Sequence, residues 1–276
     1  MRIAYSTLAF PDASLATATA LGRRWGFDGV ELRLIDGELI DPSMPAADRA
    51  RVKRTVTGAG LPVVAVDSSV RLTGDDPVPE ILRFLQLASD WESPLVRVFG
   101  GELQAAEPGQ QAARAVALEA ALEAAARVLE QCLPAAERLG VAIGVETHDA
   151  FSASSLLARL LAIVPSPWAG AVWDSHHPHR VGERPDDVCR HLGDRVLLAQ
   201  VKDARRADPS GQPDGWRLVL LGEGEVPVRE MLALLAGRGY QGWVSVEWEK
   251  RWHPEIEEPE VALPQHLEVL REWGVE

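Results

Sequence analysis

Cysteine is rare in this sequence, and long apolar runs are lacking. The 276 residues contain 2 cysteines, Cys132 and Cys189, which are far apart and have no CxxC spacing. Such thiols form neither a disulfide framework nor a zinc ribbon, and they are typical of a reducing compartment. No stretch approaches the roughly 18 uncharged apolar residues of a membrane span, and MRIAYSTLAF does not read as a signal peptide. We therefore expect a cytoplasmic protein without a membrane partner.

Positive charge is also scarce. The chain has 28 lysines and arginines against 41 aspartates and glutamates, which gives a formal net charge of −13. An acidic surface repels phosphate backbones and lacks the basic patch that nucleic-acid binding usually requires. The remaining composition, 46% hydrophobic and 25% charged, is ordinary for a folded globular protein. We therefore expect a small-molecule ligand and no nucleic-acid partner.

Short β-rich runs alternate along the chain with segments of helical periodicity. The eight runs are RIAYST from Arg2, FDGVELR from Phe27, LPVVAVDSS from Leu61, PLVRVFGG from Pro94, VAIGVETHD from Val141, WAGAVWDSH from Trp168, RVLLAQVKD from Arg195 and GWVSVEWEK from Gly242. The helical patterns cover residues 14–25, 46–58, 79–91, 118–139, 152–164, 185–192, 228–237 and 257–273.

Eight strands, each followed by a helix, predict a single (β/α)8 TIM barrel over residues 1–276. The length is close to the ~250 residues typical of that fold. An open doubly wound sheet is the alternative. Against it, no GxGxxG opens the first helix, and no obvious linker divides the chain.

Polar residues stand at the ends of the β-rich runs. They are Glu31, Asp67, Glu146, Asp174, Gln200 with Lys202 and Asp203, and Glu247. In a barrel all strands end on one face, so these side chains converge. Buried carboxylates repel one another unless positive charge lies among them. That charge is either a divalent cation or a set of arginines and lysines, from Arg33, Arg71, Arg97 and Lys202. The two explanations are equally good for Glu31 and Asp67, and for the later acids we favour the cation.

Four of these segments, in order, resemble the sugar phosphate isomerase/epimerase family of xylose isomerase-like barrels. They are VETHD at Glu146, WDSHH at Asp174 and His177, QVKDA at Gln200 and SVEWE at Glu247. LAFPDASLATATALGRRWGFDGVELR and LGEGEVP are similar too, so the likeness covers nearly the whole chain. The resemblance implies one divalent metal ion held by four residues, Glu146, Asp174, Gln200 and Glu247. It also implies that His177 contacts the substrate.

Gln200 departs from the pattern of many relatives, which have histidine at this position. If its amide oxygen binds the metal, the ligands are three carboxylates and a neutral oxygen. Hard oxygen donors favour Mg²⁺ or Mn²⁺ over Zn²⁺. We therefore predict Mn²⁺ or Mg²⁺ as the cofactor. In the alternative, Gln200 only forms hydrogen bonds inside the barrel and the metal is weakly bound or absent.

Such a site suits proton abstraction next to a carbonyl group. A divalent ion stabilises the enediolate that forms when the C–H proton leaves. Glu146 and Glu247, from the fifth and eighth strands, are the predicted catalytic bases. Return of the proton to the same carbon gives an epimer, and return to the neighbouring carbon gives an isomer. A metal-dependent dehydratase acting on a keto-polyol of the inosose type is the alternative, because loss of a β-hydroxyl starts from the same intermediate.

Further residues are predicted to bind substrate. His148 shares its strand face with Glu146, and Lys202 and Arg180 are cations near the strand ends. Alternatively, His148 lies behind the site with its hydrogen bonds satisfied, Lys202 neutralises carboxylate charge, and Arg180 does the same or is solvated at the surface. Four of the 9 tryptophans also fall in or near the later strand ends, where they suit stacking on sugars or plain packing: Trp173, Trp216, Trp248 and Trp252. Of these, Trp173 and Trp248 are placed in the predicted substrate site. His176 and His179 are expected in a loop at the rim.

The GEGE loop from Gly222 to Glu225 is acidic and makes a poor phosphate cradle, so we expect an unphosphorylated sugar, polyol or sugar acid. Two other classes are weighed. The first is a phosphodiesterase like the apurinic-site endonucleases. Those enzymes resemble a three-zinc design that takes several histidines from the early strands. The first histidine of this chain is His148, so that cluster could not be assembled. A barrel that binds sugar without turnover is the other. A homo-oligomer is an expectation by family analogy.

Overall fold

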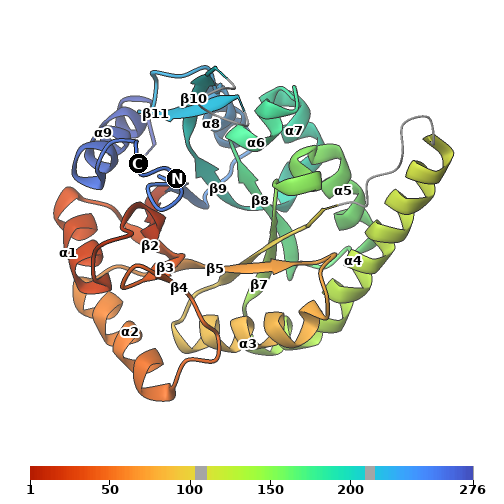
Figure 1. Cartoon of the computed structure of the whole chain (residues 1–276), viewed down its shortest axis with the longest axis horizontal. Helices are drawn as coiled ribbons and strands as arrows, with labels where there is room; N and C mark the ends of the chain where they lie inside the picture. Colours follow the sequence, from red (N-terminus) through yellow and green to blue (C-terminus); the bar gives the residue numbers. More distant parts are fainter. Residues whose placement is uncertain (103–110, 209–214, 276) are drawn as a thin grey trace.

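The computed structural model describes residues 1–102, 111–208 and 215–275, and its centre is a closed barrel of eight parallel strands. The strands follow the order β1-β12-β9-β8-β7-β6-β5-β2, and helices surround them (Figure 1). The predicted TIM barrel is confirmed. The barrel strands are β1 (Arg2–Ser6), β2 (Gly29–Leu32), β5 (Val63–Arg71), β6 (Leu95–Phe99), β7 (Ala142–Glu146), β8 (Ala169–Asp174), β9 (Val196–Val201) and β12 (Trp243–Val246).

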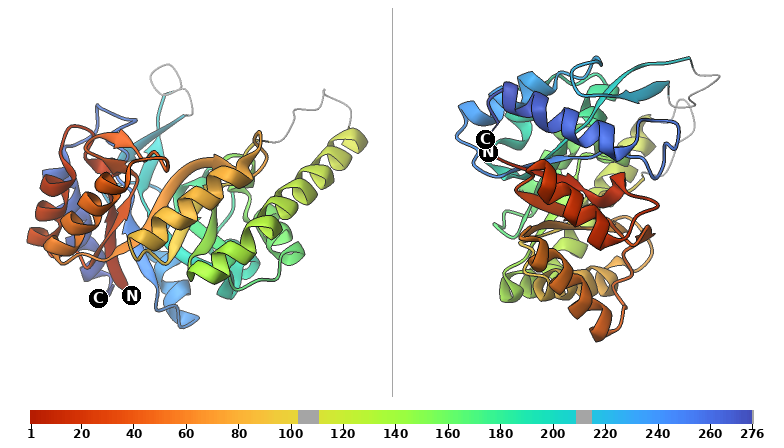
Figure 2. Two further views of the ribbon diagram at one scale, coloured as in Figure 1. Left: turned by 90° about the horizontal axis from the view of Figure 1, so that it is seen from below. Right: turned by 90° about the vertical axis from the view of Figure 1, so that its left-hand side faces the viewer.

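All eight predicted helices are present, most of them within two residues of the expected ends. They are α1 (Leu15–Trp25), α2 (Ala46–Ala59), α3 (Pro77–Asp90), α4 (Gln111–Leu139), α5 (Ser154–Ile163), α7 (Pro185–Leu192), α8 (Val228–Gly237) and α9 (Pro259–Glu272). The largest difference is α4, which begins seven residues before the expected position 118 and projects beyond the barrel (Figure 2). The two chain ends lie close together in both views of Figure 2.

Helix α1 illustrates how local sequence sets these elements. Ser14 caps the helix, since its side chain accepts a hydrogen bond of 3.1 Å from the Thr17 amide. Gly26 ends the helix at a φ of 98°, a left-handed conformation that favours glycine. Gly22 faces the ring of Tyr5 so closely that a Cβ there would lie 2.2 Å from a ring carbon. A larger residue would therefore push α1 away from β1.

The side chains that fill the barrel change from apolar to polar along the strands. Near the strand beginnings it holds an apolar cluster that includes Val172 on β8 and Leu198 on β9. Side chains two positions apart on a strand share a face, so Asp174 and Gln200 point into the same interior. Both are completely buried. The polar layer therefore lies at the strand ends, directly above an apolar floor.

Three small elements were not predicted from the sequence. A hairpin of β3 (Leu34–Ile35) and β4 (Glu38–Leu39) follows β2, and a hairpin of β10 (Asp203–Arg206) and β11 (Trp216–Val219) follows β9. A short helix, α6 (His176–Arg180), follows β8. All three extend strand ends, so they shape the polar face. In the described part of the chain, no helix combines the length and apolarity needed to cross a membrane.

Candidate metal and substrate site

The four predicted metal ligands come from four strands that are neighbours in the barrel. In barrel order, Glu247 follows β12, Gln200 lies on β9, Asp174 ends β8 and Glu146 ends β7. One carboxylate oxygen from each of the three acids lies within 4.8 Å of the others. The register places Asp174 beside Gln200. We call these four residues the oxygen quartet.

Several oxygens of the oxygen quartet are buried and incompletely satisfied. Among the described residues, Gln200 Oε1 has no hydrogen-bond partner, while Glu146 Oε2 and Asp174 Oδ2 form no hydrogen bond and contact only the cations Arg97 and Lys202. Two more carboxyl groups than cationic groups are buried at this end of the barrel: Glu31, Asp67, Glu146, Asp174 and Glu247 against Arg33, Arg97 and Lys202. Buried charge of this kind is costly without compensation. The residues therefore fit a doubly charged cation bound by oxygen atoms.

Two protein cations also lie among the carboxylates. Lys202 Nζ is 2.6 Å from Glu247 Oε2 and 3.2 Å from Asp174 Oδ2, and it is also paired with Glu249. Arg97 Nε is 3.0 Å from Glu146 Oε2, and its Nη2 is 3.4 Å from Asp67 Oδ2. For Asp67, the pairing with an arginine that the sequence left open is thus present. Arg97 thus pairs with one end of the oxygen quartet, at Glu146, and Lys202 with Asp174 and Glu247.

Burial dominates the electrostatics of the quartet. It raises the pKa of Glu146 to about 7 and that of Asp174 to about 6, against the opposing charges of Arg97 and Lys202. Burial also acts to raise the pKa of Glu247, but the nearby cations, first Lys202 and then Arg97, together outweigh it, and this pKa lies below its ordinary value. In the protein without metal, Glu146 therefore holds a proton more strongly than Glu247 does.

A pocket of about 350 Å³ opens above the oxygen quartet. Its walls include Phe99, His148, His177 and Trp252. His177 Nε2 is 3.8 Å from Glu146 Oε1 and 3.9 Å from Asp174 Oδ1. Burial lowers the pKa of His177 well below its ordinary value, so the ring is neutral near pH 7.

Comparison with known proteins identifies the fold family. The model of the xylose isomerase-like TIM barrel family matches residues 20–273. The chain belongs to this family. A search of curated protein sequences finds no match.

Solved structures with the same barrel are distant in sequence. The IolI protein, solved with a bound zinc atom, has a TM-score of 0.80 at 16% identity and covers 100% of both chains. The 3-keto-D-glucoside 4-epimerase YcjR from E. coli has a TM-score of 0.74 at 17% identity, over 99% of each chain. The probable 3-DHS dehydratase AsbF from Bacillus anthracis has a TM-score of 0.73 at 18% identity, over 98% of this chain and 99% of that one. At such identities the likeness concerns the fold.

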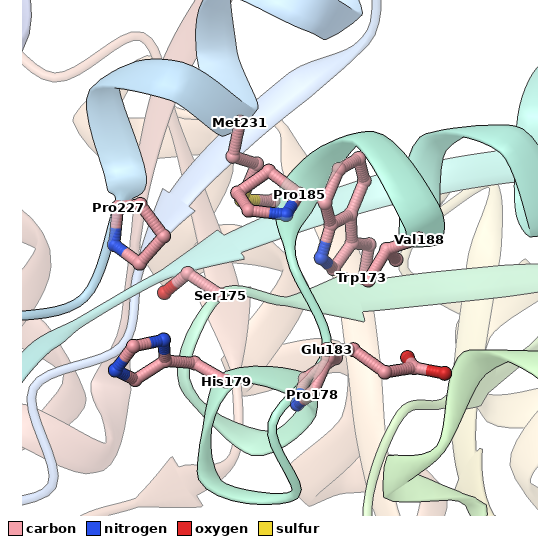
Figure 3. A pocket seen from close by; sticks show the side chains of 9 residues that line it. All are labelled: Trp173, Ser175, Pro178, His179, Glu183, Pro185, Val188, Pro227 and Met231. Carbon is pink, nitrogen blue, oxygen red and sulfur yellow. The ribbon is translucent and has the colours of Figure 1, made fainter.

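Two tryptophans of the expected substrate site lie outside this pocket. Trp173 points away from the barrel interior and lines a different cavity of about 210 Å³, beside Val188 and Met231 (Figure 3). Trp248 is fully buried, and its indole nitrogen donates to the Glu257 carbonyl at 2.8 Å. Neighbouring residues of a strand point to opposite faces, so a tryptophan next to an inward acid faces outward. Both expectations are therefore corrected.

The remaining expected residues line the pocket or its edge. His148, His177 and Lys202 all lie on its wall. Arg180 is exposed and lines an adjoining pocket of about 430 Å³, together with Trp216. Trp252, an alternative in the sequence, lines the first pocket and is 47% exposed. Aromatic and cationic side chains therefore line the outer part of the site, away from the oxygen quartet.

The histidines of α6 differ from the rim loop that the sequence suggested. His176 is 3% exposed, and its ring centroid is 5.2 Å from that of Trp216. His179 is half-buried and also contacts Trp216, at 5.3 Å. The hairpin of β10 and β11 folds over α6 and buries these rings. No sequence pattern indicated this contact, because the hairpin itself was not predicted.

Glu249 and Phe99 line the pocket without having been named as site residues. Glu249 lies two positions after Glu247, so strand alternation was the available signal. The segment that carries it is tied down by Lys250, whose ammonium donates to the carbonyls of Pro254 at 2.8 Å and Ile256 at 2.6 Å. These bonds close the loop that presents Trp252 to the pocket.

Glu31 holds the amide of Gln200 in one orientation. Gln200 Nε2 donates to Glu31 Oε1 at 2.7 Å, which turns Gln200 Oε1 away from Glu31. Both side chains are completely buried. Partners behind a metal ligand fix its orientation, and losing one typically weakens metal binding about 10- to 100-fold. Glu31 therefore fixes the orientation of the side chain that the sequence predicts as the fourth ligand.

Replacing Glu31 tests this positioning role. We expect Glu31→Leu to weaken Mn²⁺ binding about 10- to 100-fold, because the Gln200 amide loses its acceptor. Glu31→Gln keeps an acceptor oxygen on a side chain of the same size, and we expect it to retain most of the affinity. Calorimetric titration of Mn²⁺ into each metal-free variant measures the difference. Equal losses in both variants would show that the acceptor oxygen at position 31 does not control the affinity.

Proposed function

We propose that the protein is a divalent-metal-dependent isomerase or epimerase of a small sugar, polyol or sugar acid, acting by proton abstraction next to a carbonyl group. The observation that carries this proposal is the oxygen quartet, in which three carboxylates converge below a pocket and Gln200 lies beside one of them, Asp174. The fold likeness to a sugar epimerase supports it.

The oxygen quartet would hold one metal ion. Its donors are all oxygen atoms, which favours Mn²⁺ or Mg²⁺, although IolI was solved with zinc. Bound there, the ion would supply positive charge to the two oxygens of an enediolate as the C–H proton leaves. This role needs the substrate carbonyl and its neighbouring hydroxyl to face the floor of the pocket.

The protein's own groups divide the remaining tasks. Glu146 and Glu247 are the outer members of the oxygen quartet, so they approach a substrate from different sides, and each is a base for one face of the reacting carbon. His177 is neutral and lies over Glu146, where it is suited to bind a hydroxyl group. Lys202 offers an ammonium beside Glu247 that favours the charged form of this base.

Solvent exchange tests the proposal. We expect the metal-loaded protein to incorporate deuterium from D₂O at one carbon of its substrate in a screen of keto- and aldo-sugars with added Mn²⁺. Nuclear magnetic resonance identifies both the labelled carbon and the product. Epimer or isomer formation supports the first proposal. Loss of water to give a conjugated enone, seen by ultraviolet absorbance, would instead support a dehydratase, the activity ascribed to AsbF. Binding of a sugar without exchange, with metal present, would rule out both enzymes.

A further inference from the structure

We infer that the protein has a second cation site beside the oxygen quartet, built from Glu146, His148 and His177. Each of these residues offers one ligand atom, and the three atoms lie within 4.8 Å of one another. The ring centroids of His148 and His177 are 4.4 Å apart. We call this group the histidine site. It shares Glu146 with the oxygen quartet, so one carboxylate would bridge two ions.

The His177 ring supplies the first reason to expect a ligand. Its Nε2 is buried and, among the described residues, has no hydrogen-bond partner. The carboxylate oxygens Glu146 Oε1 and Asp174 Oδ1 are 3.8 Å and 3.9 Å away, which is too far for a hydrogen bond. A cation between these two atoms would contact both. Burial of the side chain to 9% exposure shields such a contact from water.

The orientation of the His148 ring supplies the second reason to expect a ligand. Its Nδ1 is 2.7 Å from Asp149 Oδ1, which leaves Nε2 for a ligand. Metal-binding histidines almost always use their other ring nitrogen in this way, on a carboxylate or a carbonyl. Asp149 is held in turn by Arg71, 3.2 Å from Oδ2, and adopts a φ of 51°. A non-glycine residue in this left-handed conformation is strained, and such strain clusters at functional sites.

The two sites differ in the metals they favour. The histidine site offers two imidazole nitrogens and one carboxylate oxygen, whereas the oxygen quartet offers oxygen alone. Nitrogen ligands shift the preference towards Zn²⁺ and Co²⁺. Three protein ligands also leave coordination positions open towards the pocket, whose wall includes both histidines. An ion there occupies space that a substrate needs, so excess zinc is expected to compete with substrate.

Metal stoichiometry tests this inference without any assay of turnover. Equilibrium dialysis of the metal-free full-length protein against Zn²⁺ is expected to give two tightly bound ions per chain. Glu247→Ala removes one ligand of the oxygen quartet and should leave one tight ion. His148→Ala should also leave one, with the affinity of the second ion reduced at least about 100-fold. His148 is 30% exposed but its ring lies 4.5 Å from that of Phe99, so circular dichroism is used to check that His148→Ala is folded.

A matched control separates the histidine site from adventitious binding to imidazole. His253 lines the adjoining pocket but lies outside the proposed ligand set, so His253→Ala should still bind two ions. Cobalt(II) gives a second readout, since its visible absorption reports nitrogen ligands and should fall in His148→Ala but not in His253→Ala. One tight ion in the unmodified protein, or two in His148→Ala, would overturn the inference. The exchange experiment on the oxygen quartet would be unaffected by that failure.

Discussion

The Glu146→Gln variant is expected to lose solvent deuterium exchange by about 1,000-fold or more. A positioned general base typically contributes 10²- to 10⁴-fold, and this residue is also a proposed metal ligand. Glutamine preserves the volume of the side chain but removes the charge that Arg97 contacts at 3.0 Å. Exchange rates measured by nuclear magnetic resonance in D₂O, at saturating Mn²⁺, give the comparison. Mn²⁺ affinity should fall in the same variant.

A glutamate of the outer helices serves as the control. Glu137→Gln makes the same chemical change on α4, where the side chain is exposed, and exchange should be unchanged. Full exchange by Glu146→Gln would exclude Glu146 as the base. Full metal affinity with lost exchange would keep the catalytic role and remove Glu146 from the ligand set.

The Lys202→Met variant is expected to be strongly destabilised in the absence of added metal. Lys202 is 1% exposed and contacts Asp174, Glu247 and Glu249, so its loss leaves buried carboxylates uncompensated. Removing one partner of a buried ion pair typically costs about 3–5 kcal/mol, which corresponds to a fall in Tm of roughly 10 °C. Thermal unfolding followed by circular dichroism measures it.

Metal should restore part of this loss. A divalent ion bound to the oxygen quartet supplies positive charge that Lys202 no longer provides, so Mn²⁺ should raise the Tm of Lys202→Met more than that of the unmodified protein. Lys53→Met is the matched control, because Lys53 forms an exposed ion pair with Glu92 and its loss should change little. An unchanged Tm for Lys202→Met would show that the ammonium is not needed to balance the buried carboxylates.

The sequence predicted the parts of this site that depend on the barrel alone. Parallel strands all end on one face, so acids at their ends had to meet whatever the loops do. Glu146, Asp174 and Glu247 came together for this reason. The same alternation rule explains the error for Trp173, because a residue directly before an inward acid has to face outward. Counting positions from Asp174 would have avoided it.

The sequence predicted less where the path of a loop decides the outcome. His176 is covered by Trp216, which arrives 40 positions later on a hairpin without a clear local signal. Glu249 reaches Lys202 because the chain continues inward beyond β12. The pairing of Gln200 with Glu31 joins residues 169 positions apart. Such contacts depend on how distant parts of the chain pack together, and local sequence patterns do not predict them. The cytoplasmic location and the homo-oligomer stay predictions.

The bonds of Lys250 to the loop after β12 have a consequence for ligand binding. That loop carries Trp252, and two carbonyls and a carboxylate hold the lysine in place inside it. Ordering a flexible segment on binding lowers affinity, because its conformational freedom is lost at that moment. Here that conformational freedom is already lost when the protein folds. A ligand that packs against the Trp252 indole therefore binds to a surface that is ordered beforehand.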